Sequence, residues 1–206
     1  MYRIQIIGIL ITHLIVSVSL TPEAWADEPD EQQLLNGKAF VYKLKSEKPK
    51  GRGYRLVYTV DAPLHIFWQF KTDFDNDFLL SNKYIAIHRL ISRSGNVVIT
   101  ENKYRDVSKS RFRWQITVVS DRHRLEFVLL NPDENNHEFH FGHIQLEPLG
   151  SKTKVTQVAY FDFFGAFLWV NYPLYGGMSD FLKYNARWEQ QTILERIHLY
   201  QSQDNQ

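Results

Sequence analysis

The sequence predicts an α+β protein in which one antiparallel sheet is closed by a long C-terminal helix. Between Tyr54 and Phe163, short segments alternate apolar and polar residues and are separated by turn residues, which indicates a meander of strands. From Met178 to about Leu199 the apolar residues keep helical spacing, and neither glycine nor proline interrupts them. Strands grouped before a final helix are typical of a single α+β domain.

The N-terminal half of this pattern begins with two strands, Lys38–Leu44 and Tyr54–Val60. Pro63 follows, and proline suits the first turn of a helix, where its missing N–H has no helical acceptor. Apolar residues three or four positions apart then predict a short helix that ends at the acidic run near Asp73.

The remaining strands are predicted from alternation between turn signals. Ser94-Gly95-Asn96 joins the first pair as a hairpin, an Asn/Pro/Asp-rich turn spans 131–136, and a Pro/Gly turn spans 148–151. The predicted strands are 85–92, 97–104, 111–119, 122–130, 139–146 and 154–163.

The N-terminus has the order of a secretory signal peptide: a cationic start, an apolar run and an Ala-Trp-Ala cleavage site before an acidic stretch. We therefore expect residues 1–26 to be a leader, 27–36 a flexible arm, 37–200 the domain and 201–206 a disordered tail. The leader predicts export to the periplasm, and its retention as an anchor is the alternative.

Charge and cysteine content limit the functional classes. The formal net charge is +1, which gives no argument for nucleic-acid binding. No cysteine is present, so disulfides and a lipid-anchored lipoprotein are excluded. The absence of cysteine also favours a bacterial periplasm over a small disulfide-stapled secreted domain.

Three segments carry a resemblance to a known family. VDAPLHIFWQFKTDFDN (60–76) resembles its strand-to-helix signature, EFHFGHIQLEPLGSKTKVTQVAYFDF (138–163) its penultimate hairpin, and GGMSDFLKYNARWEQQTILERI (176–197) its closing helix. The family is the START-like, or SRPBCC, superfamily, and the resemblance covers about residues 36–197. It implies a helix-grip (Bet v 1-like) fold, a curved antiparallel sheet wrapped around a long C-terminal helix with an apolar cavity between them.

The resemblance implies candidate cavity residues. Half of the stretch YFDFFGAFLWVNYPLY (160–175) is aromatic, and in a helix-grip fold it would lie near the cavity mouth. Its rings then form a rim or lid that contacts a membrane during lipid exchange, or they simply pack on the sheet. The predicted wall residues are Trp114, Phe127, Met178, Phe181, Asn185 and Trp188, and the predicted rim residues are Phe167, Trp169, Tyr172 and Tyr175.

Two polar residues on the apolar stripe of the last helix, Asn185 and Thr192, favour a pocket over a solid core. A buried polar group needs a partner, and pocket water, a ligand head group or a neighbouring strand could each supply one. Rings that fill the concave volume completely remain the alternative.

Metal binding has weak support. Asp73, Asp75 and Asp77 match the start of a calcium loop, but phenylalanine and tyrosine stand where glycine and glutamate are required. His137, His140 and His143 are three apart, so a regular strand points them to opposite faces, unless a bulge at Gly142 re-aims His143. We predict neither a metal nor a cofactor.

The sequence favours a binding protein over an enzyme, and we assign no catalytic residue. Common catalytic motifs are absent. Arg113, Glu126, Tyr160 and Asp162 could serve as acid or base only if they faced the cavity. The main hypothesis is a periplasmic protein that binds a lipid or other hydrophobic small molecule, with transport of that ligand as an extension of the same hypothesis. The alternatives are a cyclase-like enzyme on an apolar substrate and a partner-binding module with a filled core. The resemblance is to the part of the superfamily that includes polyketide cyclases and coenzyme Q-binding-like proteins. It gives neither the ligand nor the oligomeric state.

Overall fold

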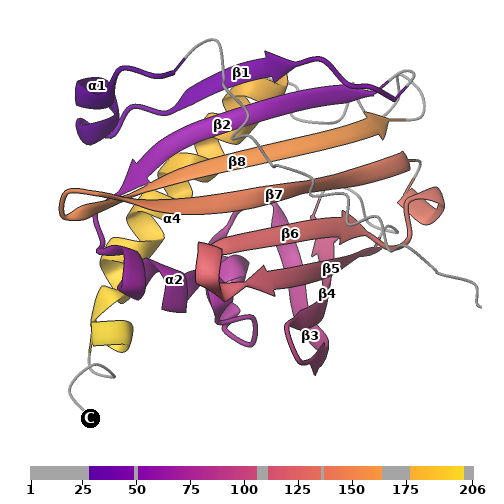
Figure 1. The fold of residues 1–206 in the computed structure, drawn as a ribbon. Helices are drawn as coiled ribbons and strands as arrows, with labels where there is room; N and C mark the ends of the chain where they lie inside the picture. The colour runs from indigo at the N-terminus through magenta and orange to yellow at the C-terminus, as the bar shows by residue number, and fades with distance from the viewer. Residues whose placement is uncertain (1–27, 49–50, 106–110, 136, 164–176, 202–206) are drawn as a thin grey trace, which may run out of the picture.

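The computed structural model describes residues 28–48, 51–105, 111–135, 137–163 and 177–201. These residues form one eight-stranded antiparallel sheet in the order β1-β2-β8-β7-β6-β5-β4-β3. Figure 1 shows the sheet with the C-terminal helix α4 behind it. The strands are β1 (Phe40–Leu44), β2 (Arg52–Val60), β3 (Ile85–Ser94), β4 (Val97–Tyr104), β5 (Arg111–Val119), β6 (Arg124–Leu129), β7 (His137–Leu149) and β8 (Lys152–Phe163).

Helices stand at the start, between β2 and β3, and at the end of the described chain. They are α1 (Glu31–Leu35), α2 (Leu64–Thr72) and α4 (Gly177–Gln201), with 3-10 turns η1 (Asp77–Ser81), η2 (Ser120–Arg122) and η3 (Asp133–Asn135). Each predicted strand and both predicted helices therefore exist, with bounds that differ by a few residues. Within the described residues, no helix is both long and apolar enough to cross a membrane.

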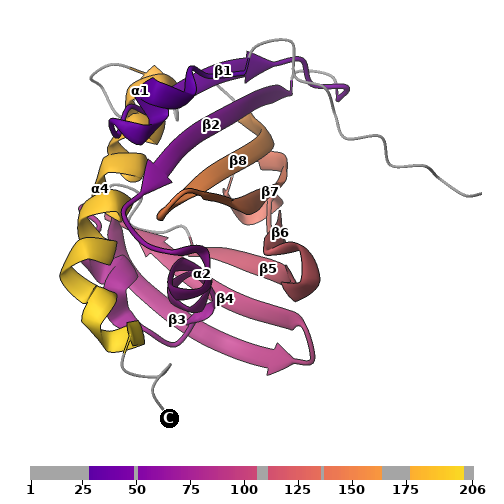
Figure 2. The ribbon, with the colours of Figure 1, turned by 60° about the vertical axis from the view of Figure 1, so that its left-hand side comes forward.

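The sheet is bent, and α4 lies along its concave side, as Figure 2 shows. The predicted helix-grip architecture is confirmed. The curvature brings β3, β4 and β5 round to face β2 and α4, with α2 between them. One apolar face of the sheet and one stripe of α4 consequently enclose a common interior.

The packed part of this interior lies where α2 meets α4. Phe67, Phe70 and Ile193 are fully buried there, and the Phe70 ring lies 4.3 Å from that of Phe78. Full burial of such side chains contributes about 1.5–3 kcal/mol each. This cluster fixes α4 against the sheet at the α2 end.

The described part of the expected flexible arm, residues 28–36, contains a short helix. The stretch Glu31–Leu35 is helical, and the Asp30 side chain caps it by accepting a hydrogen bond from the Gln33 amide at 2.8 Å. Leu34 is buried, and its carbonyl oxygen accepts a hydrogen bond from the Thr59 hydroxyl at 2.6 Å. An apolar residue and a good N-cap outweighed the polar composition from which we expected disorder.

Candidate functional site

A cavity of about 340 Å³ lies between the concave face of the sheet and α4. Its volume falls within the range of ordinary small-molecule sites. Side chains from β2 to β8 and from α4 line it, together with the connection from α2 to β3. The alternative of a core filled completely by rings is therefore wrong.

All six predicted wall residues line this cavity: Trp114, Phe127, Met178, Phe181, Asn185 and Trp188. Trp114 and Phe127 meet edge to face, with ring centroids 5.8 Å apart, on the neighbouring strands β5 and β6. The other four come from the inward stripe of α4. The structure thus brings the six together, while their role in holding a ligand stays a prediction.

The predicted rim residues Phe167, Trp169, Tyr172 and Tyr175 lie outside the described residues, as do the predicted leader (1–26) and most of the predicted tail. The rim therefore also stays a prediction.

Asn185 and Thr192, the two polar residues on the apolar stripe of α4, have different hydrogen-bond partners. The Asn185 amide accepts a hydrogen bond from Asn82 Nδ2 at 2.9 Å and donates one to the Phe181 carbonyl at 3.0 Å. Thr192 is buried away from the cavity and donates to the Trp188 carbonyl at 2.7 Å. Both side chains therefore have hydrogen-bond partners within the protein. Their presence on the apolar stripe needs neither pocket water nor a ligand head group.

A charged cluster stands in the cavity wall near α2. Glu189 of α4 accepts hydrogen bonds from the Tyr58 hydroxyl and, at 2.6 Å, from Lys71 Nζ. Burial raises the pKa of Tyr58 well above its usual value, and the negative charge of Glu189 adds to the shift. Tyr58 therefore stays a hydrogen-bond donor, and the buried carboxylate has two partners, as a buried charge requires.

A second polar group, His88, comes from β3. One ring nitrogen lies 2.7 Å from Asn102 Oδ1 and the other 3.0 Å from the Phe74 carbonyl oxygen. Both nitrogens are thus engaged by the protein.

A third polar group consists of His137 and His140 on β7. Both line the cavity, with ring centroids 5.8 Å apart. The expectation that histidines three apart face opposite ways is wrong here, because an irregularity in the β7–β8 register lies between these two residues. Three positions on β7 from His137 to His140 stand opposite two positions on β8, so β7 has one extra residue, which places His137 on the same face as His140.

Desolvation keeps both imidazoles neutral. Burial lowers the pKa of His137 to about 4, although Asp162 opposes the shift. Burial, with His137 adding to it, lowers the pKa of His140 to about 3. Neutral imidazole has one donor and one acceptor nitrogen, so this end of the cavity presents uncharged polar groups.

Gly142 does not bulge, and His143 does not join the other two histidines at the cavity. The register is regular there, with Gly142 opposite Ala159. A Cβ on Gly142 would lie 2.0 Å from the Val158 carbonyl oxygen, so the residue allows close approach of β8. Burial lowers the pKa of His143 to about 4, with Arg124 adding to the shift.

The acidic residues that follow α2 bind to other residues of the protein. Asp73 Oδ2 accepts hydrogen bonds from Tyr200 at 2.9 Å and from Asn76 at 3.0 Å, and Arg196 binds Asp77 at 3.0 Å. Among the described residues, no group of three or more His, Cys, Asp or Glu side chains could hold a metal ion.

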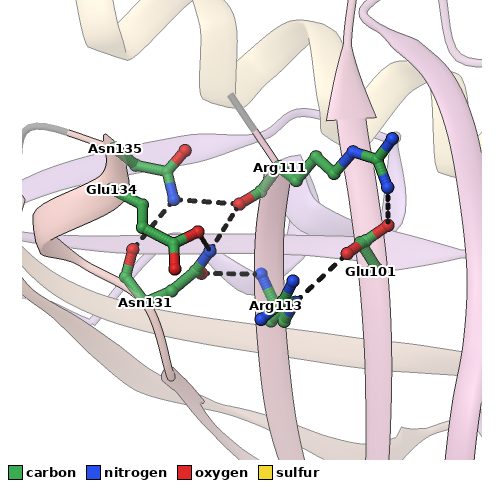
Figure 3. Close-up of polar contacts among 6 residues, drawn as sticks. All are labelled: Glu101, Arg111, Arg113, Asn131, Glu134 and Asn135. Carbon is green, nitrogen blue, oxygen red and sulfur yellow. Dashed lines mark hydrogen bonds and ion pairs between the residues drawn. The ribbon is translucent and has the colours of Figure 1, made fainter. Parts of the chain in front are cut away.

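Arg113 is exposed and does not line the cavity, whereas its neighbour Trp114 on β5 does. Figure 3 shows Glu101 between Arg111 and Arg113, at 3.2 Å from each. Asn131 and Asn135 donate to the Arg111 carbonyl and so join the η3 turn to β5. This network is structural. The other proposed acid or base residues, Glu126, Tyr160 and Asp162, are not among the cavity-lining residues either.

Sequence reasoning missed Lys71, Glu189 and His140 as cavity residues. A usable signal existed for Glu189, which is four residues after Asn185 and so falls on the apolar stripe of α4. Lys71 likewise kept the helical spacing of the apolar residues of α2. For the pair His137 and His140 no such signal existed, since alternation argued against it.

Searches with the sequence against protein-family models and against curated proteins find no significant match. Comparison of the structure with solved structures does find neighbours.

Three neighbours illustrate the fold. The Zhui aromatase/cyclase from Streptomyces sp. R1128 has a TM-score of 0.52 at 11% identity, over 72% of this chain and 94% of its own. A STAR-related lipid transfer protein from Xanthomonas axonopodis has a TM-score of 0.51 at 13% identity, over 72% and 93%. Norcoclaurine synthase from Thalictrum flavum has a TM-score of 0.50 at 10% identity, over 83% and 95%.

These neighbours differ in what their names say they do, so at this identity they establish the fold and not the activity. The chain has the helix-grip fold of the START-like, or SRPBCC, superfamily.

Proposed function

We propose that the protein binds a lipid or another hydrophobic small molecule in the cavity between the sheet and α4. The observation that carries this proposal is the cavity itself, about 340 Å³ with a lining rich in aromatic and aliphatic side chains. Apolar area removed from water contributes about 25 cal/mol per Å², so a ligand that fills such a space gains affinity without many polar contacts. The names of the lipid transfer and cyclase neighbours are consistent with a hydrophobic ligand.

The first test is whether the purified protein carries a ligand. Native mass spectrometry should detect a bound lipid or uptake of the apolar fluorescent probe N-phenyl-1-naphthylamine. Absence of both would contradict the proposal.

A cavity-filling variant locates the binding. Ile144 lines the cavity, so Ile144→Trp should reduce probe uptake at least tenfold. The matched control is Ile91→Trp, because Ile91 is an exposed residue of β3 and the same substitution there leaves the cavity unchanged. Equal uptake by the two variants would place the probe elsewhere.

The enzyme alternative requires two or more titratable side chains that face the cavity, and Lys71, Glu189 and His140 satisfy this condition. Lys71 and Glu189, however, form an ion pair with each other at 2.6 Å. Proton exchange with a substrate would require this ion pair to break. The arrangement therefore favours binding over catalysis.

We propose further that the protein acts in the periplasm and contacts a membrane while the ligand is exchanged. The sequence of residues 1–26 supports export, and the aromatic residues of 160–175 support the contact. Intact mass of protein from a periplasmic fraction should correspond to a chain that starts at Asp27. A full-length mass in the membrane fraction would indicate a retained anchor instead.

A further inference from the structure

The polar side chains that line the cavity differ in whether they already form hydrogen bonds within the protein. Glu189, His88 and Asn185 each have hydrogen-bond partners within the protein at two sites. Their hydrogen bonds stabilise the cavity wall and leave few donors or acceptors free for a ligand.

His140 is different. Its ring contacts Trp114 at 4.8 Å, Phe161 at 5.2 Å and Phe127 at 6.2 Å between centroids. Within the described part of the chain, the imidazole of His140 makes ring contacts but no hydrogen bond. A buried polar group in that position is costly unless something bonds to it, and it faces the cavity.

The surroundings also restrict the charge of that partner. The ring of His137 is a further neighbour, with its centroid 5.8 Å from that of His140, and burial lowers the pKa of both imidazoles. The negative charge of Asp162 acts on His137, but Asp162 is not among the residues that line the cavity. An ionised ligand group beside His140 would therefore lose its hydration without gaining a direct counter-ion, which costs much free energy.

We propose, on the basis of the function proposed above, that the ligand is a neutral amphiphile whose hydroxyl or carbonyl oxygen hydrogen-bonds to the imidazole of His140. Its apolar body extends from there along β7 and β8 toward Tyr58. His140 is opposite Phe161, and Phe161 is opposite Arg52 at the start of β2. Tyr58 is six residues further along β2, about 20 Å at 3.3 Å per residue, which gives room for an elongated molecule.

The test uses three probes of one chain length: decane, 2-decanol and 2-decanone. Each competes with N-phenyl-1-naphthylamine for the cavity of the full chain, and the measured quantity is the affinity ratio of the oxygenated probe to decane. Wild-type protein should prefer the alcohol or the ketone. His140→Phe keeps an aromatic ring but removes both nitrogens, so this preference should fall about three- to tenfold.

Two further variants make the test specific. His140→Gln keeps a donor and an acceptor and should retain part of the preference, including if His140→Phe fails to fold. Gln157→Leu is the matched control, because Gln157 also lines the cavity but lies four residues along β8 from Phe161, about 13 Å away. This control should leave the preference unchanged.

The outcomes separate the two proposals. If none of the three probes displaces the reporter from wild-type protein, hydrophobic ligand binding itself is wrong. If all three displace it with equal affinity, or if the preference survives His140→Phe or disappears in Gln157→Leu instead, the cavity binds apolar molecules but His140 does not select the oxygen.

Discussion

The protonation of His140 is coupled to folding. The pKa of this imidazole is about 3 in the folded protein because of its burial, against about 6.5 in an unfolded chain. Between these values the unfolded state binds one more proton, so the free energy of unfolding falls as the pH falls below about 6.5. Above that pH both states are neutral and the histidine contributes no pH dependence.

Replacing the histidine should therefore flatten the acid side of the stability profile. From pH 7 to pH 5, wild-type protein should lose about 2 kcal/mol more than His140→Phe does. Urea unfolding at the two pH values measures this difference. His198→Gln, at an exposed position on α4, is the control and should follow the wild type. Parallel losses for wild type and His140→Phe would show that His140 is not held neutral by burial.

The Lys71–Glu189 ion pair leads to a second prediction at the residue scale. Both side chains are mostly buried, and Lys71→Met would leave the Glu189 carboxylate with Tyr58 as its one partner among the described contacts. Loss of one member of a buried pair costs about 3–5 kcal/mol. Urea unfolding should show a loss of that size for Lys71→Met, and a smaller loss when Glu189→Gln is added.

The control for this pair is the more exposed pair of Arg124 and Glu126, 3.1 Å apart. Arg124→Met should cost under about 1 kcal/mol. Similar costs at the two sites would mean that the cavity admits enough water to screen Glu189.

Single residues show where sequence reasoning succeeds and fails. Trp114 and Met178 could be placed at the cavity because periodicity identifies the inward face of a strand or helix. His137 could not, because the irregularity before His140 changes which face it occupies, and nothing in the local sequence requires that irregularity. Whether Asn185 bonds to protein or to a ligand also depends on Asn82, which is distant in sequence.

At the scale of elements, Gly142 explains how closely β7 and β8 approach. A methyl group there would lie 2.0 Å from a backbone oxygen of β8, and the backbone has little freedom to move. Gly142→Ala should therefore destabilise the protein by about 1–3 kcal/mol. Thermal or urea unfolding measures this loss.

Gly53 of β2 provides a comparison in a similar strand position. An added Cβ there would meet the Tyr160 ring at 2.7 Å and the Leu44 side chain at 2.9 Å, and side chains can rearrange more easily than backbone. Gly53→Ala should cost less than Gly142→Ala. The reverse order would show that β8 shifts readily relative to β7.

The elements themselves were largely predictable because their boundaries are marked locally. The hairpin at 94–96 and the turn at 148–151 carry glycine, and Gly95 and Gly150 both have positive φ, which glycine adopts without strain. Helix α1 was missed because its stability comes from Leu34, whose burial depends on contacts made outside the segment.

At the scale of the whole molecule, the fold could be predicted but the cavity could not. The order of strands and the terminal helix imply a bent sheet with a helix on its concave side. The volume of the cavity depends on how all the side chains around it pack together. No local sequence pattern determines that packing. A filled core and a lined cavity are therefore both compatible with the sequence, and the packed structure contains the cavity.

Stability is unevenly distributed over this sheet. Strand β2 is buried on both faces from Gly53 to Val60 and pairs with β1 and β8. Strand β3 is at the edge of the sheet, and its C-terminal half is exposed. Amides of β2 and β8 should exchange with solvent through global unfolding, and those near the β3–β4 turn through local opening. Hydrogen exchange followed by mass spectrometry should find slow exchange in the first group and fast exchange in the second.

A ligand in the cavity adds a further expectation, because it stabilises the folded state against global unfolding. With N-phenyl-1-naphthylamine at 100 times its dissociation constant, the gain is about 2.7 kcal/mol, so exchange in β2 and β8 should slow about 100-fold. Amides near the β3–β4 turn should not change, because they open without emptying the cavity. Ile144→Trp, which fills the cavity, should abolish the slowing. Slowing at the turn alone, or equal slowing in Ile144→Trp, would place the ligand outside the space between the sheet and α4.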